Sequence, residues 1–193
     1  MLGLKLPTDP RWVNLASMNI EEILTDHAFC EQKAASTGIS LIQTYAEYEE
    51  LVDALVPIVT EEWGHFKMVL DHLKKRGLKL GRQRKDVYVN ELNKFVRKGD
   101  SRRESLIEKL LFSALIEARS CERFRLLSKE IPDADLSNFY KNLMVSEAGH
   151  YRFFLDMACS LGDKEKVLLR WDEWLNYEAD VLKNIAVRGD RIH

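Results

Sequence analysis

The chain has 193 residues, of which 46% are hydrophobic, and a net charge of −2 at pH 7. This length predicts a single domain, residues 1–193, with a substantial core. Its three cysteines form no CxxC pair, which argues against a disulfide framework and for a reducing compartment. No segment approaches the roughly 20 apolar residues that cross a bilayer, and the N-terminus lacks a signal-like apolar run. The composition therefore predicts a soluble cytoplasmic protein.

The first half of the chain reads as two long helices. One is expected from Asn19, which forms a capping-box pattern with Glu22, to about residue 45. The second is expected over 47–76, with a bend at a proline and an end at a glycine, Pro57 and Gly77. Its apolar residues recur at three- and four-residue steps, which is helical spacing. Trp63 and Phe66 in this helix are expected to pack against another element.

The second half continues the helical pattern after a long connection. Residues 77–100 form this connection, with a short helix expected at 86–97. Ser101 and Glu104 form a second capping box, which opens a helix that ends before Pro132. Further helices are expected at 135–161 and in the C-terminal segment 163–184. The sequence therefore predicts an all-α, ferritin-like four-helix bundle with a long second-to-third connection and an additional C-terminal helix.

An internal repeat carries the strongest chemical signal. Residues 60–71 (TEEWGHFKMVLD) align without gaps with residues 145–156 (VSEAGHYRFFLD), and both contain Glu-x-x-His. Positions three apart share one helix face, and a carboxylate on an apolar face is costly unless something pairs with it. The alternative interpretation is two buried Glu–His hydrogen bonds. We predict instead that both pairs bind metal: Glu62 and His65, and Glu147 and His150.

A ferritin-like di-iron bundle needs one further glutamate from each of its other two helices. Glu31 precedes Glu62 by 31 residues, and Glu117 precedes Glu147 by 30 residues. Carboxylates offset the charge of two cations, and imidazole suits iron; manganese is the alternative metal. The predicted ligands, which are also the predicted catalytic residues, are Glu31, Glu62, His65, Glu117, Glu147 and His150.

Other residues near these ligands have open alternatives. Glu122 competes with Glu117, which is preferred on spacing. His27, one turn before Glu31, is expected to support that ligand rather than to act as a seventh one. His72 and His193 are expected to be surface groups. Cys121, one turn beyond Glu117, either lines an oxygen pocket or is a small core residue.

Positive charge is concentrated in one segment. Residues 72–103 contain 12 Lys or Arg against 3 Asp or Glu, which leaves a charge of −11 on the remainder. Such a stretch on an otherwise acidic protein predicts a polyanion partner, here RNA, although a solvated loop is the alternative. Tyr88 and Phe95 offer stacking surfaces or anchor this segment. The predicted RNA-binding residues are Lys74, Lys75, Arg76, Lys79, Arg82, Arg84, Lys85, Lys94, Arg97, Lys98, Arg102 and Arg103.

Several blocks of the sequence resemble the tRNA 2-methylthio-N6-isopentenyladenosine hydroxylases (MiaE-like proteins), over nearly the whole chain. These blocks are DHAFCEQKAA, ELVDALVPIVTEEWGHF, LKKRG, LIEARSCERF and SEAGHYRFF. The resemblance implies a di-iron monooxygenase that hydroxylates the isopentenyl side chain of this nucleoside in the anticodon arm of tRNA. It also implies dioxygen as co-substrate and an external electron-donor protein. Family members commonly carry larger residues where this chain has Gly64 and Gly149.

Three other functions are compatible with parts of this pattern. A ferritin-like oxygenase or peroxidase acting on a small molecule would bind metal without binding RNA. An iron-storing relative would form a cage, which the long C-terminal helix disfavours. A purely RNA-binding helical protein would bind no metal at all.

Overall fold

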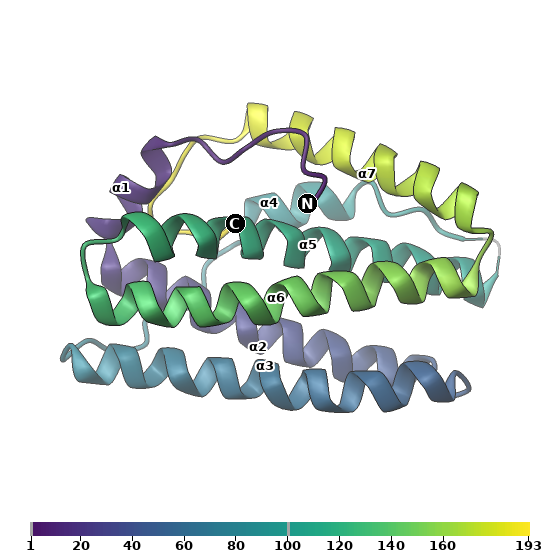
Figure 1. The fold of residues 1–193 in the computed structure, drawn as a ribbon, viewed down its shortest axis with the longest axis horizontal. Helices are drawn as coiled ribbons and strands as arrows, with labels where there is room; N and C mark the ends of the chain where they lie inside the picture. Colours follow the sequence, from purple (N-terminus) through teal and green to yellow (C-terminus); the bar gives the residue numbers. More distant parts are fainter. Residues whose placement is uncertain (1, 100) are drawn as a thin grey trace. The chain divides into compact units, whose positions relative to one another are not determined.

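Seven helices make up the fold of the computed structural model, which describes residues 2–99 and 101–193 (Figure 1). Met1, in the predicted domain, and Asp100, in the predicted connection, lie outside the described residues. No strand occurs in the described part of the chain, so the predicted all-α class is confirmed. The helices are α1 Arg11–Ser17, α2 Ile20–Thr44, α3 Glu49–Lys75, α4 Val87–Asn93, α5 Arg102–Glu130, α6 Ala134–Leu161 and α7 Lys164–Asn184.

The chain divides into two compact units. The α2/α3 unit comprises residues 12–85 and 188–192, and the α5/α6 unit comprises residues 1–11, 86–187 and 193. Each unit is built around a pair of long helices that run alongside each other (Figure 1). The expectation of one domain over residues 1–193 stays a prediction.

The α2/α3 unit is a helix hairpin closed by the short connection at residues 45–48. Leucines from both helices, among them Leu24 and Leu55, are fully buried. A Cβ added at Gly38 would lie only 2.5 Å from Cγ2 of Val59, so this glycine lets α2 and α3 approach closely. The hairpin therefore depends on a small residue as well as on apolar burial.

The helix ends only partly follow the predicted signals. Ser101 caps α5 by accepting a hydrogen bond from the Glu104 N–H, and Gly77 follows α3 with φ +68°, as its position predicted. Helix α2 begins directly after Asn19, as predicted, but the expected capping bond is wrong, because the Asn19 side chain makes no cap bond and instead donates to the Leu15 carbonyl at 2.7 Å. Helix α1 was not predicted.

The α5/α6 unit is completed by α7, which packs on both long helices, and by α4, which packs on α7. Buried ion pairs join these elements. Arg119 of α5, which is fully buried, donates to both carboxylate oxygens of Glu178 on α7, at 2.8 and 2.9 Å. Tyr88 of α4 donates to the same carboxylate at 3.0 Å. Removal of one partner from a buried pair costs about 3–5 kcal/mol, so this network fixes α7 against its unit.

Candidate metal centre and nucleic-acid interface

In the α2/α3 unit, three predicted ligands come together. Glu31 lies on α2, and Glu62 and His65 lie one turn apart on α3. One ligand atom from each lies within 4.8 Å of the others. The two glutamates are only 4% and 2% exposed. A buried carboxylate pair requires a compensating cation or proton, which a metal ion supplies.

The distances in this group suit a metal ion. His65 Nδ1 lies 3.4 Å from a Glu31 carboxylate oxygen and 3.7 Å from one of Glu62. Two donors that each lie about 2.1 Å from one ion are separated by roughly 3 to 3.4 Å at bond angles near 90 to 110°. The separations of His65 Nδ1 from the two carboxylates are therefore within a few tenths of an ångström of those that one ion requires.

His27 lies behind this group. Its Nε2 is 2.6 Å from Glu31 Oε1, while Glu31 Oε2 is the oxygen that faces His65. The imidazole thus contacts the opposite oxygen of the ligand carboxylate and orients it. This geometry supports the role expected for His27, that of a residue that holds Glu31 in place.

The α5/α6 unit contains the matching group. Glu117 lies on α5, and Glu147 and His150 lie one turn apart on α6. Their ligand atoms also lie within 4.8 Å of one another, and His150 Nδ1 is 3.3 Å from Glu147 Oε2. All three residues are buried. The internal repeat therefore produces the same donor set in both units.

The alternative ligand Glu122 belongs to a different environment. Its carboxylate accepts hydrogen bonds from the Thr8 backbone N–H at 3.0 Å and the Thr8 hydroxyl at 2.7 Å, and it also pairs with Arg119. These bonds engage both oxygens of Glu122. The arrangement favours Glu117 as the ligand from α5.

Cys121 lies one turn beyond Glu117 and is buried. Its thiol donates to the Met144 carbonyl at 3.4 Å. Burial, reinforced by the nearby Glu147 carboxylate, raises the pKa of this thiol to about 11. In this structure Cys121 is therefore a neutral thiol that joins α5 to α6.

Two further histidines differ from expectation, since neither is a free surface group. His72 is buried, and its Nδ1 is 3.1 Å from an Arg76 guanidinium nitrogen. His193 stacks on the Tyr88 ring at 5.6 Å and contacts the Ser120 hydroxyl at 2.8 Å. Neither contact could be predicted from the sequence, because the partners of His193 lie far away along the chain and the contact of His72 with Arg76 depends on side-chain geometry.

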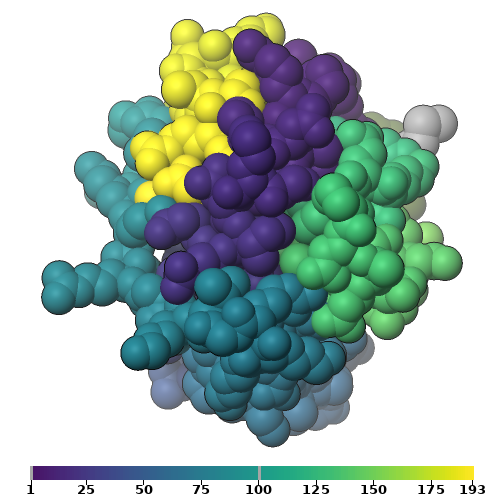
Figure 2. All heavy atoms as spheres, turned by 90° about the vertical axis from the view of Figure 1, so that its left-hand side faces the viewer, coloured from purple at the N-terminus to yellow at the C-terminus, as the bar shows by residue number. Residues whose placement is uncertain are grey.

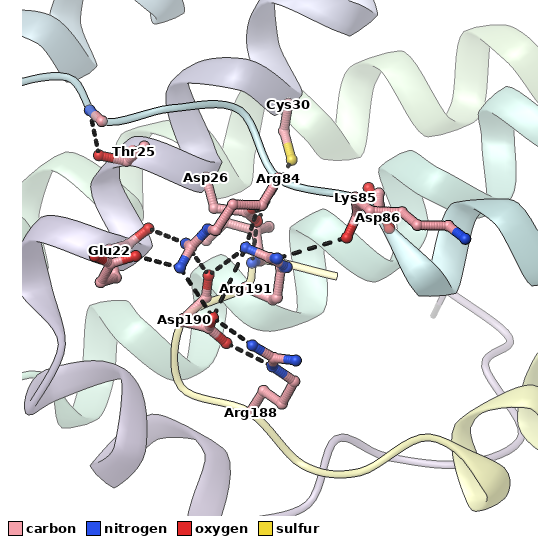
Figure 3. A network of polar contacts seen from close by, with 12 residues as sticks. Glu22, Thr25, Asp26, Cys30, Arg84, Lys85, Asp86, Arg188, Asp190 and Arg191 are labelled. Carbon is pink, nitrogen blue, oxygen red and sulfur yellow. Dashed lines mark hydrogen bonds and ion pairs between the residues drawn. The ribbon is translucent and has the colours of Figure 1, made fainter.

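Several cations of the basic stretch are already paired. Arg84 binds Glu22, the Asp190 carboxylate and the Asp190 carbonyl, which fastens the connection after α3 to α2 and to the tail at 188–192 (Figure 3). Lys94 pairs with Glu91, and Arg97 with Glu173 at 2.7 Å. Within the predicted set, Lys74 (to Asp71), Arg76 (to His72), Arg84, Lys94 and Arg97 have such partners.

Other cations of the stretch remain available. Side chains of the teal region, which includes the connection between α3 and α4, project from the surface in Figure 2. Tyr88 and Phe95 do not offer stacking surfaces: Tyr88 is buried, and Phe95 stacks on Tyr177 at 4.2 Å. Both rings anchor the segment. Among the described residues, the exposed cations of the predicted set that take part in no ion pair are Lys79, Arg82, Lys85, Lys98 and Arg103.

These observations define an all-α protein whose two long hairpins each present two glutamates and a histidine. A solved structure from Synechococcus, described as a protein with aldehyde deformylating oxygenase activity, shares this fold. It has a TM-score of 0.92 and 33% identity, over 98% of this chain and 94% of that chain. The class of protein is therefore a ferritin-like helical oxidoreductase, as predicted.

Sequence comparison identifies the family. The profile described as tRNA-(MS[2]IO[6]A)-hydroxylase (MiaE) matches residues 2–193, and the chain belongs to this family of tRNA hydroxylases. A tRNA 2-(methylsulfanyl)-N(6)-isopentenyladenosine(37) hydroxylase from Pseudomonas putida is 37% identical over 85% of this chain and 78% of its own length. The enzyme of the same description from Salmonella typhimurium is 29% identical over 93% of this chain and 83% of its own length.

Among the described residues, no helix is long and apolar enough to span a membrane.

Proposed function

We propose that this chain hydroxylates the isopentenyl side chain of 2-methylthio-isopentenyladenosine in tRNA, with dioxygen as co-substrate and electrons from an external donor protein. One observation carries the proposal: a tRNA hydroxylase family member presents the same buried group of two glutamates and one histidine in each of its two units. We expect it to act in the cytoplasm.

The proposed metal ligands are the six residues predicted from the repeat. Glu31, Glu62 and His65 would hold iron from one unit, and Glu117, Glu147 and His150 from the other. Two ferrous ions carry a charge of +4, which the four carboxylates offset, so the buried groups are neutral when loaded. Bound iron would supply the activation of dioxygen for insertion into a carbon–hydrogen bond.

Other residues of the chain would orient the ligands and bind the tRNA. His27 keeps one Glu31 oxygen engaged and leaves the other directed toward His65. The exposed cations of the connection, Lys79, Arg82 and Lys85, would bind phosphates of the anticodon arm. The modified base must leave its stack to reach the ligands, as unpaired RNA bases do in many protein complexes.

One observation favours a second candidate function. The Synechococcus protein that shares this fold at 33% identity is described as having aldehyde deformylating oxygenase activity, which is small-molecule chemistry. A small-molecule oxygenase or peroxidase would need the same buried ligands but would not need the exposed cations. It predicts metal binding without salt-sensitive affinity for tRNA.

The decisive experiment is mass spectrometry of nucleosides from isopentenyl-modified tRNA after incubation with iron-loaded protein, a reductant and dioxygen. We expect one added oxygen on the isopentenyl group, and none with Glu147→Ala. If the tRNA is unchanged while the iron centre is verified as reduced and turns over an aldehyde, the small-molecule function is correct instead.

A further inference from the structure

One face of α3 exposes aromatic and aliphatic side chains near the metal ligands. Trp63 is 48% exposed and Val56 is 53% exposed. The Phe66 ring lies 4.9 Å from that of Trp63. The expectation that Trp63 is packed is therefore wrong. We refer to Val56, Trp63, Phe66 and Lys67 as the α3 stripe; they lie close together on the helix because they are spaced by three, four and seven residues.

The second copy of the repeat shows what normally covers this face. Tyr151 occupies the position of Phe66, and its ring lies 6.0 Å from that of Trp171 on α7. Trp63 is replaced by Ala148, a small residue, in this copy. In the described part of the α2/α3 unit, α3 packs extensively only on α2, so no helix takes the place of α7. The stripe thus corresponds to the face of α6 that packs on α7, but no helix covers it, and it carries Trp63 where α6 has Ala148.

The charge beside the aromatic residues indicates the kind of partner. Lys67 is exposed, and within the described residues it takes part in no ion pair. It lies one turn after Trp63, about 6 Å along the helix axis. Lys74 follows on the same face, about 16 Å from Trp63 along the axis. Exposed aromatic rings interleaved with cations are the pattern by which proteins bind single-stranded nucleic acid, with stacking on the bases and charge on the backbone.

We propose that the α3 stripe binds an unpaired nucleotide of the tRNA, with Trp63 stacked on its base and Lys67 on its phosphate. This inference rests on the proposed tRNA substrate. Trp63 directly follows Glu62, and consecutive Cα atoms are about 3.8 Å apart. Successive side chains on a helix point about 100° apart, so a base on Trp63 lies on the helix face next to the one that carries the ligands. The stripe holds the neighbour of the reacting nucleotide while the exposed connection holds the arm.

The test measures binding of a fluorescein-labelled, isopentenyl-modified anticodon stem-loop by anisotropy, over a series of salt concentrations. We expect Trp63→Ala to weaken binding by about 5- to 150-fold, since base stacking contributes about 1–3 kcal/mol. Trp63→Phe keeps most of this affinity. The logarithm of the binding constant falls linearly with the logarithm of the salt concentration, and one phosphate contact to a single strand contributes about 0.7 to the steepness of this slope. We expect Lys67→Ala to reduce the steepness by that amount and Trp63→Ala to leave it unchanged.

Matched controls separate stacking from other effects. Leu169→Ala removes a 68%-exposed apolar side chain on α7 and should leave affinity unchanged. All variants are measured iron-loaded and metal-free, so that loss of iron does not produce the difference. If Trp63→Ala binds RNA as well as wild type does, the inference is wrong. It is also wrong if that variant slows turnover only when a protein, and not a chemical reductant, donates electrons, because the stripe then docks the donor. Wild-type protein that does not bind the RNA would instead overturn the proposed function itself.

Discussion

At the scale of single residues, the surroundings of two glutamates on α5 decide which of them we propose as an iron ligand. Glu117 lies with Glu147 and His150, whereas Glu122 is held by Thr8 and Arg119. The sequence favoured Glu117 only through its 30-residue spacing from Glu147. The network around Glu122 could not be predicted, because Thr8 is 114 residues away along the chain.

This difference predicts opposite effects for two matched substitutions. Glu117→Gln should lower the iron content below two per chain and change the stability of the metal-free protein little. Glu122→Gln should keep two irons per chain but lower the free energy of unfolding by about 1–3 kcal/mol, because its charged hydrogen bonds are weakened. Elemental analysis and urea unfolding of both variants check this. Loss of iron from the Glu122 variant alone would exchange the two assignments.

At the scale of elements, the helix pairs show which parts of the fold follow from local sequence. The long helices were predicted to within a few residues because their apolar periodicity extends over many turns. Helix α1 was missed because its seven residues, RWVNLAS, span barely two turns and carry too short a pattern. The capping box at Asn19 does not form because α1 lies directly before it: the Asn19 side chain donates to the Leu15 carbonyl and its backbone N–H donates to the Ala16 carbonyl. Glu22 instead pairs with Arg84.

The glycines of the α2/α3 hairpin give a prediction at this scale. A Cβ added at Gly64 meets no atom within 4 Å, so Gly64→Ala should stabilise α3 by about 1 kcal/mol through helix propensity. Gly38→Ala should destabilise the protein despite the same gain, because its Cβ would press on Val59. Thermal unfolding of the two metal-free variants measures the contrast. Equal shifts would show that α2 and α3 can separate without cost.

At the scale of the whole molecule, charge is distributed very unevenly. The segment 72–103 carries +9, but ion pairs within each unit use part of this charge for structure. Composition predicted the excess and could not separate the paired from the unpaired cations, because the partners of Arg84 and Arg97 come from distant segments. Only the three-dimensional structure separates the cations that form ion pairs within the fold from those that we propose bind tRNA.

This division predicts which cations matter for tRNA. Charge reversal of Lys79, Arg82 and Lys85 to Glu should weaken tRNA binding at least tenfold in moderate salt and lower its salt dependence, while iron content stays at wild-type level. Lys94→Glu, at a cation already paired with Glu91, should have a much smaller effect. Filter binding over a range of salt concentrations measures both. If both variants lost the same affinity for tRNA, the net charge of the protein, and not the position of the unpaired cations, would determine binding.

The two Glu-x-x-His copies also carry information about the origin of the chain. Each unit contains a glutamate on one long helix and the paired motif 30 or 31 residues later on the next. A gene segment that encoded one such hairpin, once duplicated and fused, accounts for both units. Helices α4 and α7 belong to only one of the two units, and the exposed Trp63 and the small Ala148 stand at equivalent positions of the two copies.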